Sequence, residues 1–159
     1  MADADWRKLL TECLDSTIVG SLATVDDLGP WSCPIYFIYD KDFNIYFISN
    51  EVSRHILNIR ENPRVGISIY DPQKAVKNVQ LGVEIRGVAS EVPGEKIDQV
   101  YSEREKRITR VSIFEPEGHE GHFIKSHSGV FIMIKPVEIK YVNTEVFDGE
   151  AQQVPIGKL

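Results

Sequence analysis

The hydrophobic pattern of this chain is dominated by six segments with the two-residue period of β-strands. In residues 64–70, for example, Val65, Ile67 and Ile69 alternate with small or polar residues, which predicts a strand with one apolar face. The predicted strands cover residues 18–25, 31–40, 43–49, 64–70, 79–92 and 130–142. A parallel doubly wound sheet needs a helix between successive strands, and most of these have none. The order therefore favours a mainly β fold, a small antiparallel barrel with peripheral helices.

Three of the strands have irregular patterns. The apolar phase of residues 79–92 changes after Gly87, and that of residues 130–142 slips at Pro136, so we expect a bulge or sharp bend there. Bent strands allow a small barrel to close. Residues 31–40 are apolar at both alternations, which predicts burial on both faces, either inside a barrel or at a subunit contact.

The remaining segments predict a few helices and loops. Apolar residues at helical spacing predict a helix over residues 3–14, and a second helix follows Ser53. Residues 95–107 have helical character with a charged outer face. Further segments are interpreted as the turn 26–30, the loops 71–78 and 110–128, and a tail over 143–159 with a possible short hairpin. We expect one domain over 1–159, with 1–15 as its N-terminal helical segment.

The bulk composition excludes several classes of protein. The chain has 159 residues, of which 42% are hydrophobic and 26% charged, which is ordinary for a globular domain. Its formal charge of -6 opposes binding to nucleic acid or to anionic membranes. The longest apolar run, residues 130–134, is too short to cross a bilayer. Two cysteines without CxxC spacing and no signal peptide lead us to expect a cytoplasmic protein.

The segment 47–65 combines a strand, a helix start and a second strand, and it suggests an anion site. Ser53 is a good N-cap, and Asn62-Pro63 ends the helix. The unpaired amides and the dipole of a helix N-terminus attract anions. Arg54 adds a fork of donors. Taken alone, a capping serine and a solvated arginine would explain the same residues.

The order of these elements resembles the flavin-binding split-barrel family that includes pyridoxamine 5'-phosphate oxidase. The resemblance covers residues 10–142 and is strongest in 39–50, YDKDFNIYFISN, and in 53–65, SRHILNIRENPRV. It implies a six-stranded antiparallel split β-barrel that forms a homodimer, with FMN at the subunit interface. The residues it implies as cofactor-binding are Ser49, Ser53, Arg54, His55, Ile48, Gln80 and Ser32.

The chain also departs from the vitamin-converting oxidase of this family. By our alignment, Ser32 and Phe37 stand where that enzyme has an arginine and a lysine that contact the flavin. Losing two charged hydrogen bonds would raise the dissociation constant for FMN by about two to four orders of magnitude. Residues 145–159 also lack the arginine–histidine substrate signature. The resemblance therefore implies a flavin-dependent oxidoreductase that acts on another small molecule, with no catalytic residue identified.

Three alternatives remain open at this point. His119, His122 and His127 lie close together in the sequence, and histidine is a common ligand of zinc or haem iron. A haem-degrading branch of the same fold uses one histidine from this region, so a haem-binding or haem-degrading protein is the main alternative. The missing substrate signature also allows a non-enzymatic flavin-binding module. A deazaflavin in place of FMN is the third.

Overall fold

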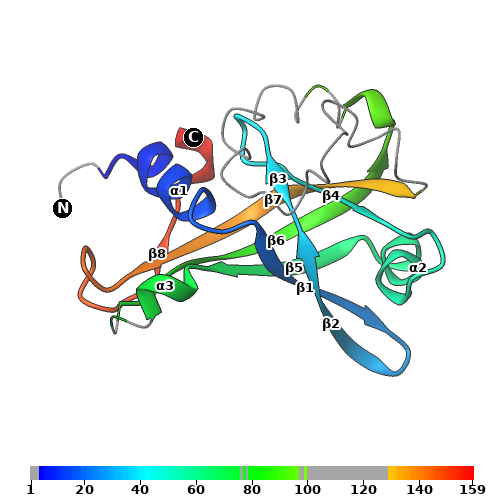
Figure 1. Cartoon of the computed structure of the whole chain (residues 1–159), viewed down its shortest axis with the longest axis horizontal. Coiled ribbons are helices and arrows are strands. Elements are labelled where there is room, and N and C mark those ends of the chain that lie inside the picture. The colour runs from blue at the N-terminus through cyan, green and yellow to red at the C-terminus, as the bar shows by residue number, and fades with distance from the viewer. Residues whose placement is uncertain (1–3, 76, 78, 97–98, 100–128) are drawn as a thin grey trace, which may run out of the picture.

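The protein is an antiparallel sheet that curls around an apolar core, with short helices at its margins (Figure 1). The computed structural model describes residues 4–75, 77, 79–96, 99 and 129–159. The helical elements are α1 (Trp6–Leu14), α2 (Arg54–Glu61), α3 (Pro72–Ala75) and the 3-10 turn η1 (Ile156–Lys158). The strands are β1 (Val19–Asp26), β2 (Gly29–Tyr36), β3 (Ile38–Tyr39), β4 (Ile45–Ser49), β5 (Arg64–Tyr70), β6 (Leu81–Val92), β7 (Val130–Asn143) and β8 (Gln152–Gln153).

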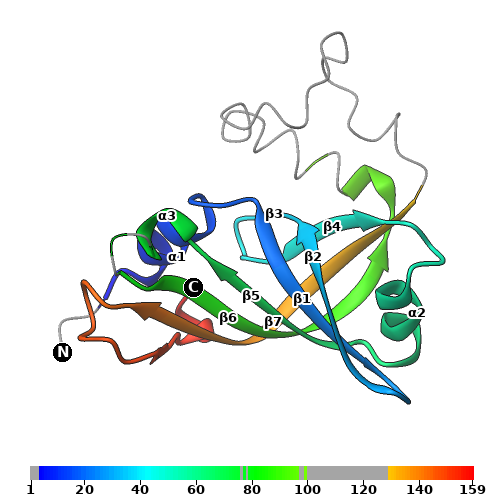
Figure 2. The same ribbon diagram turned by 60° about the horizontal axis from the view of Figure 1, so that its bottom comes forward.

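The strand order is β2-β1-β5-β6-β7-β4-β3, with β8 paired to β7, and each pair is antiparallel. The predicted antiparallel split-barrel fold is thus confirmed, although the described residues form eight strands rather than six, because the predicted strand 31–40 is divided into β2 and β3 and the short β8 is added. The inner faces of the strands share one hydrophobic cluster with Leu10 and Leu14 of α1 and with Ile56 and Ile59 of α2. The two helices lie at opposite ends of the sheet in both ribbon views (Figures 1 and 2).

The predicted irregularity at Gly87 and Pro136 is confirmed. Arg86 pairs with Glu138 and Gly87 pairs with Pro136, so Val137 is an extra residue on β7. Proline is tolerated at this position because a bulge removes the need for its missing amide. β6 and β7 consequently form a long bent pair that runs through the sheet (Figure 2).

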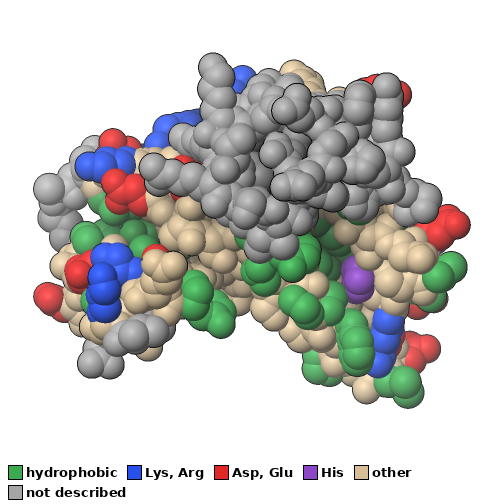
Figure 3. Space-filling view, in the orientation of Figure 1, with side chains coloured by type: hydrophobic (Ala, Val, Ile, Leu, Met, Phe, Trp, Pro, Cys, Tyr) green, Lys and Arg blue, Asp and Glu red, His purple; other side chains and the backbone are tan. Residues whose placement is uncertain are grey.

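The prediction of one continuous strand over residues 31–40 is wrong. The segment forms two strands, β2 and β3, separated at Phe37. Within the single chain β2 is largely exposed, with Trp31 38% and Tyr36 54% accessible, because among the described strands it lies at the sheet edge and pairs with β1 alone. Apolar side chains follow the β1–β2 hairpin toward its turn on the face shown in Figure 3. Burial on both faces would need a contact from outside the described residues, and a subunit contact of this kind stays a prediction.

Smaller corrections concern the ends of elements. The turn 26–30 contracts to Asp27 and Leu28, and Gly29 supplies the positive φ of 114° that closes it. The predicted loop 71–78 contains α3, whose first amides donate to the Asp71 carboxylate. The tail adds β8 to the sheet and also contains η1. Of the predicted helix over 95–107, residues 95 and 96 are helical; most of it, and the loop 110–128, lie outside the described residues.

Candidate functional site

The connection between β4 and α2 is folded tightly around Asn50. The Asn50 side chain accepts a hydrogen bond from the Val52 amide at 3.0 Å, and its carbonyl accepts one from the Ser53 amide at 3.0 Å. The Ser53 hydroxyl also donates to this carbonyl, at 2.7 Å. An asparagine that bonds to the backbone two residues ahead stabilises such a turn. The turn places the start of α2 beside the end of β4.

Three polar side chains meet at this point, and we call Ser49, Ser53 and His55 the serine–histidine cluster. Ser49 Oγ lies 3.0 Å from Ser53 Oγ and 2.7 Å from His55 Nε2, and Ser53 Oγ lies 3.3 Å from the same nitrogen. All three side chains are partly buried. The structure therefore brings together three of the residues that the sequence assigned to an anion site, although their contact with a ligand stays a prediction.

The first turn of α2 leaves backbone donors near this cluster. Ser53 occupies the N-cap position, but its side chain makes no capping hydrogen bond, so the expectation of a capping serine is corrected. The reason is that its hydroxyl is directed to the Asn50 carbonyl. Among the described residues, no acceptor is found for the amides of Arg54 and His55. Two amides of a helix N-terminus thus remain available for an anion.

The electrostatic state of His55 follows from its surroundings. Its ring is partly buried and lies 6.1 Å from the Phe47 ring, centroid to centroid. Burial lowers the pKa of His55 below its ordinary value of 6.5, because desolvation penalises the imidazolium form. The cluster is therefore neutral at pH 7 in the absence of a ligand.

Arg54 points in another direction. Its Nε donates to Asp26 Oδ2 at 2.7 Å, and its Nη2 donates to Asp26 Oδ1 at 3.1 Å. The guanidinium carbon lies 4.3 Å from the centroid of the Trp31 ring. Asp26 and Trp31 were not predicted as neighbours of the helix start, because they come from the β1–β2 hairpin and neither belongs to a recognisable motif.

The other predicted cofactor residues lie elsewhere on the sheet. Ile48 is partly buried on β4, next to the cluster. Ser32 lies on β2, where its hydroxyl is 2.9 Å from that of Ser21, in a shallow groove of the open sheet face that small side chains line. Phe37, at the position of a family lysine, is 5% exposed and belongs to the core, so it offers nothing to a ligand at the surface.

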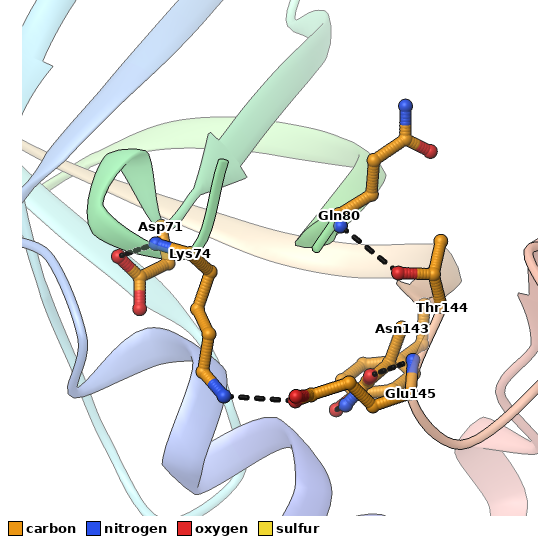
Figure 4. A network of polar contacts seen from close by, with 7 residues as sticks. Asp71, Lys74, Gln80, Asn143, Thr144 and Glu145 are labelled. Carbon is orange, nitrogen blue, oxygen red and sulfur yellow. Dashed lines mark hydrogen bonds and ion pairs between the residues drawn. The ribbon is translucent and has the colours of Figure 1, made fainter. Parts of the chain in front are cut away.

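Gln80 lies far from the serine–histidine cluster within one chain. It precedes β6 at the end that pairs with Tyr70, whereas α2 leads into the other end of β5, at Arg64. Its backbone amide donates to Thr144 Oγ1 at 3.1 Å, and its exposed side chain points away from this network (Figure 4). Gln80 also lines a groove with Tyr70. One chain thus does not bring Gln80 and the cluster together.

The histidines of the haem alternative lie outside the described residues. His119, His122 and His127 belong to residues 100–128, so their arrangement is open. Within the part of the chain that the structure describes, no group of three or more His, Cys, Asp or Glu residues is placed to hold a metal ion. No helix there is long and apolar enough to span a membrane.

Comparison with solved structures confirms the fold. A candidate pyridoxamine 5'-phosphate oxidase from Listeria innocua is 25% identical, with a TM-score of 0.61, and the match covers 86% of this chain and 98% of the other. A FAD-binding protein from Mesorhizobium loti is 21% identical, with a TM-score of 0.57 and coverage of 82% and 87%. The haem storage protein HutZ from Vibrio cholerae is 20% identical, with a TM-score of 0.59 and coverage of 80% and 87%.

Sequence comparison gives the family. UPF0306 protein PM1958 from Pasteurella multocida (strain Pm70) is 26% identical over 94 residues, which are 58% of this chain and 62% of that relative's length. The model of the pyridoxamine 5'-phosphate oxidase family matches residues 7–143, a range that includes the whole curled sheet except β8 and contains the serine–histidine cluster. The chain therefore belongs to the pyridoxamine 5'-phosphate oxidase family.

Proposed function

We propose that this protein binds FMN through its phosphate and acts in the cytoplasm as a flavin-dependent oxidoreductase on a small organic molecule. The observation that carries the proposal is the convergence of Ser49, Ser53 and His55 at the start of α2. The family resemblance implies these three residues as cofactor-binding, and their hydroxyl oxygens and the His55 Nε2 atom lie within 3.3 Å of one another. Two free cysteines, Cys13 and Cys33, suit a reducing compartment.

The chemistry of the cluster fits a phosphate. A phosphate ester has acceptor oxygens and negative charge, and the cluster supplies hydroxyls, an imidazole and two helix amides. Without a ligand these side chains bond to one another, and a phosphate would replace those contacts. The Ser53 hydroxyl would have to rotate away from the Asn50 carbonyl to donate. The chain is acidic and has no large positive field to attract a phosphate. A site of this kind would select a phosphorylated cofactor by local hydrogen bonds instead.

The flavin ring would need a second copy of the chain. The open sheet face carries small side chains from β1, β2 and β5, namely Ser21, Ala23, Ser32, Gly66 and Ser68, and exposed apolar ones at the hairpin. A flat ring or another backbone can approach such a face closely. We propose a homodimer that joins the cluster of one protomer to the Gln80 groove of its partner. Light scattering at several protein concentrations tests this, and a monomer throughout would refute it.

The bound flavin would supply the hydride or electron transfer itself. The protein's own task is then to hold the phosphate at the cluster and to position the ring against the sheet face. This explains why the sequence offers no catalytic acid or base. A non-enzymatic flavin-binding module would be recognised by two measurements. Its bound FMN would not be reduced by NADH or NADPH, and it would turn over no electron acceptor.

The first experiment is an absorption spectrum of the purified protein, with mass spectrometry of whatever denaturation releases. We expect flavin bands and the mass of FMN, and a deazaflavin would be recognised by its different mass. Titration with FMN and with riboflavin, which lacks the phosphate, then isolates the phosphate contribution. A colourless protein that binds neither compound, or that binds both equally, contradicts a phosphate-anchored flavin.

The affinity for FMN should increase as the pH falls from about 8 to about 6. His55 is neutral in the free protein because its pKa is lowered, and a neighbouring phosphate raises that pKa by favouring the charged form. Binding therefore takes up a proton between the two pKa values, and lower pH in that window favours the complex. We expect a three- to tenfold change, roughly the effect of 1 kcal/mol of preference of the phosphate for the imidazolium over the neutral imidazole. Isothermal titration at each pH measures it.

The matched control for the pH effect is His55→Gln, which keeps a polar side chain but cannot titrate. In this variant only the titration of the phosphate itself remains, and that titration acts in the opposite sense, because the phosphate loses charge near pH 6. A pH dependence that is the same in both proteins would show that His55 does not face the phosphate.

Haem is a second candidate ligand, supported by the fold shared with the haem storage protein HutZ and by the three clustered histidines of residues 119–127. Titration with haemin should then give a Soret band that is lost when His119, His122 and His127 are replaced. His55→Gln, a change of the one remaining histidine, is the control and should leave the band unchanged. No Soret shift in the unaltered protein would remove this candidate.

A further inference from the structure

An ion pair joins the turn of the β1–β2 hairpin to the start of α2. Asp26 is the last residue of β1, and both of its carboxylate oxygens accept hydrogen bonds from Arg54, at 2.7 and 3.1 Å. Asp26 Oδ1 also accepts from the Leu28 amide at 2.9 Å, which holds the turn. The hydrogen bond from Arg54 lowers the pKa of Asp26, so the carboxylate is charged at neutral pH.

Trp31 completes the contact from the other strand of the hairpin. Its ring lies against the guanidinium at 4.3 Å, the distance of a cation–π interaction. Arg54 is therefore held between a carboxylate and an aromatic face. The Nε and Nη2 donors that Asp26 occupies form one of the two edges through which arginine binds a phosphate bidentately.

The ion pair alters the charge at the proposed phosphate site. Arg54 is the first residue of α2, and it directly follows Ser53 and precedes His55. Without Asp26 the helix start would carry a full positive charge from Arg54. With Asp26 the formal charge of the pair is zero, and a carboxylate competes with any phosphate for the same donors. An anion at the cluster would meet the helix amides and hydroxyls, but only part of the guanidinium.

We propose that Asp26 is a specificity-determining residue of the phosphate site: by holding Arg54 in an ion pair, it limits the affinity for phosphorylated flavins. This inference rests on the proposed function and concerns the residues that set its strength. Asp26 acts through Arg54 and does not touch the ligand, so it is a positioning residue. Its removal should strengthen binding of FMN and leave riboflavin unaffected.

The test compares Asp26→Asn with Asp27→Asn. The asparagine of the first variant keeps an oxygen for the Leu28 amide, and both variants change the net charge by one. Asp27 is the neighbouring exposed residue in the same turn. We expect Asp26→Asn to lower the Kd for FMN about two- to fivefold, in line with the strength of partly exposed ion pairs, and Asp27→Asn to change it less than about 1.5-fold. Fluorescence quenching of FMN and of riboflavin gives both constants.

Combining Asp26→Asn with Arg54→Gln shows whether the gain passes through Arg54. If it does, the gain in FMN affinity disappears in the double variant, because no guanidinium remains to be released. Three results would overturn the inference. Asp26→Asn could lower the affinity for FMN, it could have the same affinity as Asp27→Asn, or its gain in affinity could persist in the double variant that lacks Arg54. Failure of the proposed function has a different result, since the unaltered protein would then show no preference for FMN over riboflavin.

Discussion

Replacing Ser49 and Ser53 together by alanine is expected to weaken FMN binding about a hundredfold and to leave riboflavin binding unchanged. Each hydroxyl would donate to a charged phosphate oxygen, and such a hydrogen bond contributes about 1.5 to 3 kcal/mol. The loss of both hydrogen bonds would therefore raise the Kd by at least about two orders of magnitude. Water molecules that replace the hydroxyls would offset a part of this loss. Riboflavin has no phosphate, so its affinity reports only the ring. Titration of both compounds with the purified variant measures the difference.

Ser90→Ala is the matched control for this variant. Ser90 is exposed on β6, and it pairs with Met133 of β7. It has the same side chain as the cluster residues but lies outside the cluster, so FMN binding should remain within about twofold. If the double variant still prefers FMN over riboflavin as strongly as the unaltered protein does, the phosphate lies elsewhere and the proposed function loses its main support.

The fold could be predicted because its signals are local in the sequence. The alternation of Val65, Ile67 and Ile69 matches the buried face of β5, and the change of phase at Gly87 and Pro136 marks the bulge. A strand pattern depends only on which face each residue occupies, so a single sequence contains it. The pattern of residues 31–40 left open whether a barrel interior or a subunit contact buries both faces, because a double-sided apolar pattern does not say what covers the second face.

The site was only partly predictable for a related reason. Ser49, Ser53 and His55 lie within a stretch of seven residues, and the family resemblance added Ser49 and His55 to the helix start that the strand–turn–helix pattern had indicated at Ser53. The partners of Arg54 come from another hairpin, 28 residues away in the case of Asp26. Contacts of this kind depend on how β1 packs against α2, where Thr24 and Asn58 also form a buried hydrogen bond of 3.0 Å. No sequence motif predicts these contacts between the hairpin and the helix.

The bulge links the fold to the site through the pairing of the strands. Ser49 ends β4, which pairs with the first part of β7, up to Ile134. The helix α2 leads into β5, which pairs with β6 next to Gly87. The Ala89 amide also donates to the Pro63 carbonyl just after α2, at 2.8 Å. We therefore expect the bend of the β6–β7 pair at Gly87 to influence how β4 and α2 meet.

Gly87→Ala is accordingly expected to destabilise the protein by about 2 to 4 kcal/mol, the range of severe overpacking. A Cβ at this position would lie 2.5 Å from Ile134 Cγ2 and 2.8 Å from the Lys135 carbonyl oxygen. The isoleucine is fully buried and the carbonyl is backbone, so relief requires β7 to move away from β6. Denaturant unfolding at one protein concentration measures the loss. FMN binding should fall in the variant that remains folded, because the same movement separates the end of β4 from α2.

Gly66→Ala is the control, since a Cβ on that strand residue would meet nothing closer than Ala23 Cβ at 3.8 Å. We expect its stability to be unchanged or slightly higher, because alanine restricts the unfolded chain more than glycine does. If Gly87→Ala is as stable as Gly66→Ala, β7 can shift without cost and the bulge does not hold the two halves of the sheet at a fixed angle. A destabilised Gly87→Ala protein that binds FMN normally would instead separate the bend from the site, and the cluster would then depend on the Asn50 turn alone.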